Sequence, residues 1–212
     1  MKAEETIRPT ATASRRALAG IGLLLALVVC LLAGPVSQGR AAEHTEITGE
    51  YGKEGPKSTG LPSGGCRIGW DSGAEHLLVF GEGSIYGLAV SPGAATALGG
   101  KFPISAGIGT SCGEPDMEVD PSNGNIYAVQ SGGGGQVFGW DRSGEKLSGF
   151  PATIAGSAES CGIDVGPGDE IFAGNYRGGG SVAKFKADGT ANGTIPVGSS
   201  YCKLAVNRSN GD

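Results

Sequence analysis

Four cysteines divide the chain into similar stretches, and this internal repeat constrains the fold more than any other feature. Cys66, Cys112, Cys161 and Cys202 each follow a hydrophobic residue and a proline at a short distance, and their spacings are 46, 49 and 41 residues. The tripeptide Ser-Cys-Gly recurs at two of these sites. Similar sequences on both sides of each cysteine, repeated at a near-constant spacing, indicate consecutive copies of one structural unit.

The order of features within a unit predicts a small antiparallel sheet. After Cys112, apolar runs at 117–120, 126–129 and 136–141 are separated by an Asn-Gly turn and a glycine cluster, and a fourth run closes on the hydrophobic-proline pair. The same order follows Cys161, whereas the unit from Cys66 matches only in outline. Alternating runs joined by such turns are typical of a four-stranded meander. A meander that repeats every 40–50 residues predicts β-propeller-like blades.

Composition favours the same all-β fold class. Glycine accounts for 41 of 212 residues, against a usual share of about 7%, and it suits many tight turns while disfavouring helix. We therefore expect about three blades and a partial fourth, in an incomplete ring. A four-stranded sheet cannot bury both of its faces alone, so neighbouring blades must stack. Residues 199–212 and the outermost faces are expected to lack partners. Another stacked-sheet or sandwich architecture is the alternative.

The second unit resembles the NHL-repeat family of β-propellers. Its stretch between Val119 and Val129 is similar to the first hairpin of that repeat, and the stretch between Val137 and Gly144 is similar to its third strand and turn. The resemblance extends more loosely over 61–212 and implies a propeller fold. It implies no single function, because such propellers serve as lyases, lactonases and binding scaffolds.

The N-terminal residues predict a targeting element. Two arginines precede an uncharged, leucine-rich run from Ala17 to Ala33, and small residues up to Ala41 offer a cleavage site. Residues 1–41 are thus predicted to be a signal peptide or, if uncleaved, a membrane anchor helix. Residues 42–60 are predicted to be a linker or leading segment, and 61–212 are predicted to contain the repeats. The expected location is secreted and extracellular, with membrane anchoring through 17–33 as the alternative.

The charge balance argues against nucleic acid as a partner. Residues 1–41 carry five of the 16 basic and two of the 21 acidic side chains, which leaves 11 and 19 and a formal charge of −8. A chain with this balance and no cluster of lysine or arginine lacks the electrostatic footprint of a nucleic-acid-binding protein.

The repeat cysteines have two open interpretations. They can be small buried hydrophobes at one structural position, or, in an exported protein, they can form two disulfides. Pairing between neighbouring blades, Cys66 with Cys112 and Cys161 with Cys202, is the simplest and requires Cα atoms within about 7 Å. The spacing does not favour a metal site, because no Cys-x-x-Cys occurs.

No residue set predicts a catalytic mechanism or a cofactor. His44 lies just beyond the predicted cleavage site, and His76 lies beside a predicted strand start, where we expect a surface or edge residue, so the two histidines do not suggest a proton-relay pair. By analogy with lactonase-like propellers, Glu118 and Asp164 could face a channel metal, although nothing in their spacing selects them. Four aspartates precede Ser/Asn/Gly turns and are expected to cap them: Asp71, Asp120, Asp141 and Asp188. The two tryptophans, Trp70 and Trp140, both occur in Gly-Trp-Asp and are expected to pack between blades.

The sequence therefore predicts a non-catalytic, exported binding scaffold whose partner is an unknown protein or carbohydrate. The chain is expected to be a fragment of a longer protein. The alternative is a lyase or lactonase-type hydrolase on the same fold, with a metal site completed beyond residue 212.

Overall fold

The computed structural model describes residue 61 and residues 65–92, 94–109, 116–130, 134–157, 159–176, 180–199 and 201–212. These residues form strands and loops, with one 3₁₀ turn, η2 (Pro167–Asp169), as their only helical element. None of them belongs to a helix long and apolar enough to cross a membrane. The predicted leader 1–41 and linker 42–60, with His44, lie outside the described residues. The expected all-β class is confirmed for the part described.

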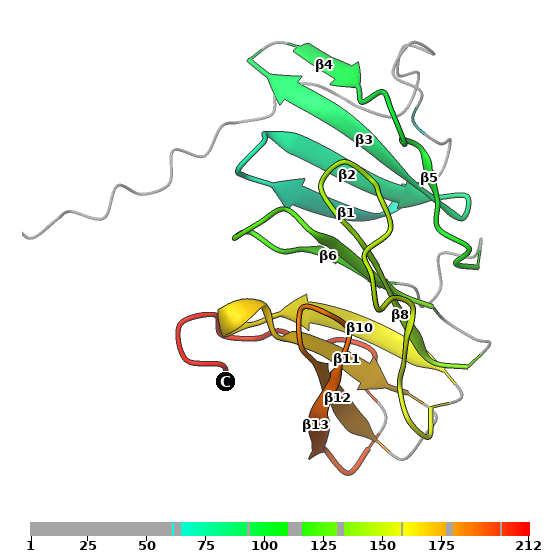
Figure 1. Ribbon diagram of the computed structural model, residues 1–212, viewed down its shortest axis with the longest axis vertical. Helices are drawn as coiled ribbons and strands as arrows, with labels where there is room; N and C mark the ends of the chain where they lie inside the picture. Colours follow the sequence, from blue (N-terminus) through cyan, green and yellow to red (C-terminus); the bar gives the residue numbers. More distant parts are fainter. Residues whose placement is uncertain are drawn as a thin grey trace, which may run out of the picture. The chain divides into compact units, whose positions relative to one another are not determined.

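The first sheet pairs its strands in sequence order (Figure 1). It contains β1 (Gly65–Asp71), β2 (His76–Gly81), β3 (Ser84–Ser91) and β4 (Ala94–Ala97), all antiparallel, and β5 (Ile104–Ser105) also pairs with β3.

The second and third sheets repeat this meander. The second contains β6 (Asp116–Val119), β7 (Ile126–Val129), β8 (Gln136–Trp140) and β9 (Ala152–Thr153). The third contains β10 (Ser160–Val165), β11 (Ile171–Asn175), β12 (Ser181–Phe185) and β13 (Ala191–Pro196). The expected four-stranded antiparallel meander is thus confirmed in all three units, including the first, which the sequence matched only in outline and in which β5 is an additional strand.

The outer edge of the first two sheets is interrupted. In the first, β4 pairs with the second half of β3 and β5 pairs with its start. In the second, Lys146 bridges Trp140 while β9 pairs with the start of β8. The hydrophobic-proline pair lies in the excursion between these two pieces, where proline, which has no N–H to donate, interrupts no ladder. In the third sheet the outer edge is a single strand, β13, whose pairing with β12 shifts in register between Thr194 and Ala191.

The core lies between the sheets, and β7 shows this most directly. Ile126 and Ala128 belong to a buried cluster shared with the first sheet, whereas Tyr127 and Val129 belong to one shared with the third. Successive side chains of a strand point to opposite faces, so the second sheet is covered on both sides. Stacking of the units, which the repeat predicted, is therefore observed.

Two expectations about packing are wrong. Trp140 is 6% exposed and lies in the cluster between the first two sheets, as predicted, but Trp70 is 47% exposed because β1 turns it to the opposite face of the first sheet. Residues 201–212 also have partners, although they form no strand: they lie against β10, bound by a disulfide and by hydrogen bonds.

Candidate binding site

The first strands of the three sheets carry a row of charged side chains. β6 contacts both β1 and β10, so their side chains meet across sheets. Asp71 ends β1 and Asp120 directly follows β6. Arg67 and Asp116 lie four residues before these aspartates and so occupy equivalent positions, and Lys203 lies four residues before Asn207. Glu118 and Asp164 lie two residues further along their strands.

Asp116 joins one half of this row. Its carboxylate accepts a hydrogen bond from Arg67 Nε at 3.1 Å and pairs with Lys203 Nζ at 3.3 Å. The third sheet has Gly162 at the equivalent position, so no side chain of β10 intervenes at that level. One carboxylate therefore bridges the first strand and the final segment of the chain.

Glu118 and Asp164 share one guanidinium in the other half. Arg208 Nη2 lies 2.6 Å from Glu118 Oε1 and 3.4 Å from Asp164 Oδ1. Burial and the nearby Asp164 carboxylate raise the pKa of Glu118, while Arg208 opposes this rise. The structure thus brings together Glu118 and Asp164, the two residues that the sequence analysis named for a metal, but both pair with the guanidinium of Arg208. Across the described ranges, no group of three His, Cys, Asp or Glu side chains is arranged to hold a metal ion.

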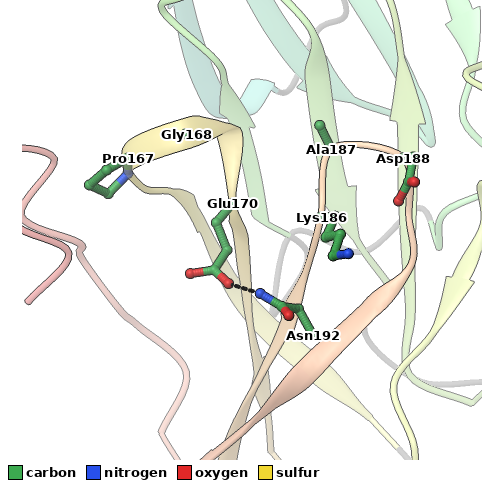
Figure 2. A pocket seen from close by; sticks show the side chains of 7 residues that line it. All are labelled: Pro167, Gly168, Glu170, Lys186, Ala187, Asp188 and Asn192. Atoms are coloured by element: carbon green, nitrogen blue, oxygen red, sulfur yellow. Dashed lines mark hydrogen bonds between the residues drawn. The ribbon is translucent and has the colours of Figure 1, made fainter.

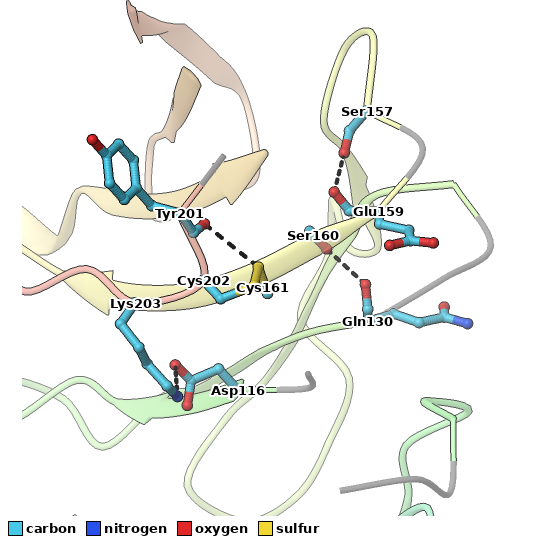
Figure 3. The surroundings of a disulfide bond; sticks show 9 residues. All are labelled: Asp116, Gln130, Ser157, Glu159, Ser160, Cys161, Tyr201, Cys202 and Lys203. Atoms are coloured by element: carbon cyan, nitrogen blue, oxygen red, sulfur yellow. Dashed lines mark hydrogen bonds and ion pairs between the residues drawn. A yellow bond between two sulfur atoms is a disulfide. The ribbon is translucent and has the colours of Figure 1, made fainter. Parts of the chain in front are cut away.

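A disulfide fixes the segment that supplies these cations (Figure 3). Cys161 and Cys202 are bonded, with their Cα atoms 4.7 Å apart, and the neighbouring Tyr201 carbonyl lies 3.5 Å from Cys161 Sγ. Cys66 is also disulfide-bonded; Cys112, its expected partner, lies outside the described residues.

An open hollow of about 470 Å³ lies between the first turn of the third sheet and its outer hairpin (Figure 2). Glu170 stands at one side, where it accepts hydrogen bonds from Lys184 Nζ at 3.0 Å and from Asn192. Lys186 and Asp188 also line the hollow. Mixed donors and acceptors could hold a small polar ligand. Sequence reasoning missed this hollow, because its lining residues are ordinary turn residues that only folding brings together.

The predicted capping role of the four aspartates is observed. Asp71, Asp120, Asp141 and Asp188 each accept a hydrogen bond from the backbone N–H two residues on. Asp71 has a second role: its buried carboxylate faces the Arg142 guanidinium, with Nη2 at 3.0 Å from Oδ1. Burial works to raise the pKa of Asp71, but the bonds from Arg142 and Gly73 outweigh it and lower that pKa.

The outer face of the first sheet is exposed only along β1. Val79 and Leu88, which the strand register places on the same face, are 9% and 1% exposed. Ile68 is 71% exposed and Trp70 47%. The equivalent residues of the second sheet, Met117 and Val119, are buried against the first sheet. In the third sheet, Ile163 and Val165 are likewise buried against the second. His76, expected at an edge, begins β2 and is partly buried.

Comparison with known proteins does not assign the chain to a family. No family model and no curated protein matches the chain. Among solved structures, a nidogen/laminin complex is 12% identical over 64% of this chain, with a TM-score of 0.45. A protein of unknown function from Bacteroides caccae is 12% identical over 70%, with a TM-score of 0.41. The chain spans about half the length of each of these two proteins, 49% and 52%. With both TM-scores below 0.5, the structural similarity is weak.

Proposed function

We propose that the chain is an exported scaffold of β-propeller-type blades that binds another protein through β1, at the exposed side of the outer face of its first sheet. The propeller interpretation is supported by three similar meanders stacked in sequence order and by the resemblance to NHL repeats over 119–144. Among the described residues, Glu118 and Asp164, the carboxylates that the lactonase analogy named for a metal, are paired with Arg208 instead, which favours the scaffold over the metal-dependent hydrolase.

One observation carries the proposal: Ile68 and Trp70 are exposed at positions whose equivalents are buried in both later sheets. The two contacts within the chain show what fits such a surface, namely the apolar face of an antiparallel sheet. The partner is therefore expected to present a twisted sheet with aliphatic side chains, continuing the stacking already seen, rather than a sugar.

Hydroxyl-radical footprinting tests the proposal. The protein is labelled as isolated from the culture medium of its host, and again after purification under mild denaturant and refolding. Trp70 is expected to be protected in the first sample and reactive in the second, whereas Tyr201, which is 57% exposed, should react in both. Equal labelling of Trp70 in the two samples would contradict a bound partner at this face.

Export is tested separately. The mature chain is expected to begin within a few residues of position 42, which N-terminal sequencing or intact mass measures. A mature chain that retains 17–33 would instead support the membrane-anchored form.

A further inference from the structure

The final segment lies over the charged row without belonging to any sheet. Residues 201–212 contain no strand, and their turn is closed by Asn207, which accepts hydrogen bonds from the Ser209 N–H and hydroxyl. Its attachment to β10 therefore depends on side chains rather than on a backbone ladder.

Three kinds of contact make that attachment. The Cys161–Cys202 disulfide is the covalent one. The ion pairs of Lys203 with Asp116 and of Arg208 with Glu118 and Asp164 have exposed cations, at 66% for Lys203 and 39% for Arg208. The Val206 N–H donates to Asp164 at 2.7 Å, and the Val206 side chain lies near Phe172.

These contacts differ greatly in strength. Exposed ion pairs hold little by themselves and are screened by salt. A disulfide, in contrast, keeps the other contacts at a high effective concentration. The sheet beneath does not need the segment for its own ladder, because β10 is paired to β11 through its backbone.

We infer that residues 201–212 are a redox-controlled strap, which a dithiol reductant releases from the first strands while the sheets stay folded. One thiolate of the dithiol attacks Cys202 Sγ, and the electron pair of the S–S bond leaves on Cys161, which then takes a proton. The second thiol attacks the mixed disulfide and frees the Cys202 thiol. The disulfide gains two electrons and two protons, and the dithiol becomes a cyclic disulfide.

Release would change the surface in a definite way. Glu118 and Asp164 lose their common guanidinium, and Asp116 keeps only Arg67. An electrostatically balanced surface thereby becomes an acidic one along β6 and β10. The inference does not rest on the proposed partner of the first sheet, because the strap lies on the third.

Limited trypsin digestion of the full chain, followed by mass spectrometry, tests the strap. With reductant, cleavage after Lys203 and Arg208 should become at least about tenfold faster, because local opening exposes these sites to trypsin. Cleavage after Lys184, within β12, should stay at its oxidised rate. Equal acceleration at Lys184 would show general unfolding and overturn the inference, and so would unchanged rates at Lys203 and Arg208.

Two sets of variants separate this disulfide from the one at Cys66. The Cys66→Ser chain retains the strap disulfide and should still respond to reductant. The Cys161→Ser/Cys202→Ser chain should be cut rapidly at Lys203 with or without reductant. If the double variant instead resists cleavage at Lys203 while β12 remains protected, the disulfide does not hold the segment, and the inference fails.

Discussion

The aspartates show how far single residues can be understood from sequence. Their capping role follows from the turn residues that come after them, and all four act as expected. The second role of Asp71 was not predictable, because Arg142 is 71 residues away in sequence. A local sequence pattern identifies a hydrogen-bond donor two residues further along the chain, but it contains no information about an arginine of the next sheet.

Replacement of Asp71 tests that second role. Asp71→Asn removes the buried charge that accepts hydrogen bonds from the Arg142 guanidinium, whose side chain is 39% exposed. We expect a loss of about 1–3 kcal/mol in the free energy of unfolding, because hydrogen bonds to charged groups are among the stronger ones. Asp188→Asn is the matched control, because Asp188 caps an exposed turn, and its loss should be smaller. Urea unfolding at neutral pH measures both, and equal losses would refute a special role for the Asp71 pair.

The same pair predicts a pH dependence. The pKa of Asp71 is lowered in the folded chain from its ordinary 3.8, so the folded state resists protonation more than the unfolded state. Its contribution is complete above about pH 3.8 and is lost as the pH falls through the lower folded value. The stability of the wild-type chain should therefore fall more steeply below this pH than that of Asp71→Asn. Parallel curves from unfolding series at several pH values would contradict this.

Gly124 is tied to the same pair. It has φ +79°, and an added Cβ would meet Asp71 Oδ2 at 2.6 Å as well as the Arg142 side chain. Gly193 has φ +98° with nothing within 4 Å, so Gly193→Ala reports the backbone cost alone, roughly 1–2 kcal/mol. Gly124→Ala should be clearly more destabilising by chemical denaturation. If the two variants lose the same stability, the packing of the pair against Gly124 is unimportant.

At the scale of elements, the apolar runs predicted the strands of the second unit well: the runs 117–120, 126–129 and 136–141 match β6, β7 and β8 to within one residue at each end. They could not predict which face of β1 is covered. Ile68 and Trp70 have the same alternation as Met117 and Val119, yet only the latter pair has a neighbouring sheet. Alternation tells which side chains share a face, whereas burial depends on what packs there.

Two isoleucines of the third sheet make this difference measurable. Ile163 on β10 is 4% exposed and Ile195 on β13 is 42% exposed. Ile163→Ala removes side-chain volume between two sheets and should cost about 2–5 kcal/mol, while Ile195→Ala should cost much less. Thermal and urea unfolding compare the two, and similar costs would mean that the sheets are not held by the cluster around Ile163.

For the whole molecule, the repeat correctly predicted stacked four-stranded units, because its period reports the unit directly. The repeat did not predict where residues 201–212 lie, because their position depends on the Cys161–Cys202 disulfide and on the Arg208 guanidinium. The charged row was equally hidden, since its members are spread from Arg67 to Arg208 and are assembled only when the first strands lie side by side.

Stacking predicts an order of amide protection. Both faces of β7 are buried, so its amides should exchange only when the molecule unfolds globally. The amides of β13, which is exposed along its length, should exchange by local opening. Hydrogen exchange at increasing low concentrations of denaturant separates the two, because only the β7 amides should show a strong dependence. Strong dependence in both strands would indicate a more uniform unit.

The interrupted outer edge has a consequence for how such a chain tolerates change in length. The third unit, with its unbroken β13, spans 41 residues between cysteines, whereas the two units with a split fourth strand span 46 and 49. Part of this surplus is taken up at the rim: from the end of the third strand to the end of the outer edge, the first two units have 14 and 13 residues (92–105 and 141–153), against 11 in the third (186–196). Insertions there would leave the inner register intact, so loops could be grafted at the rim without rebuilding the sheets.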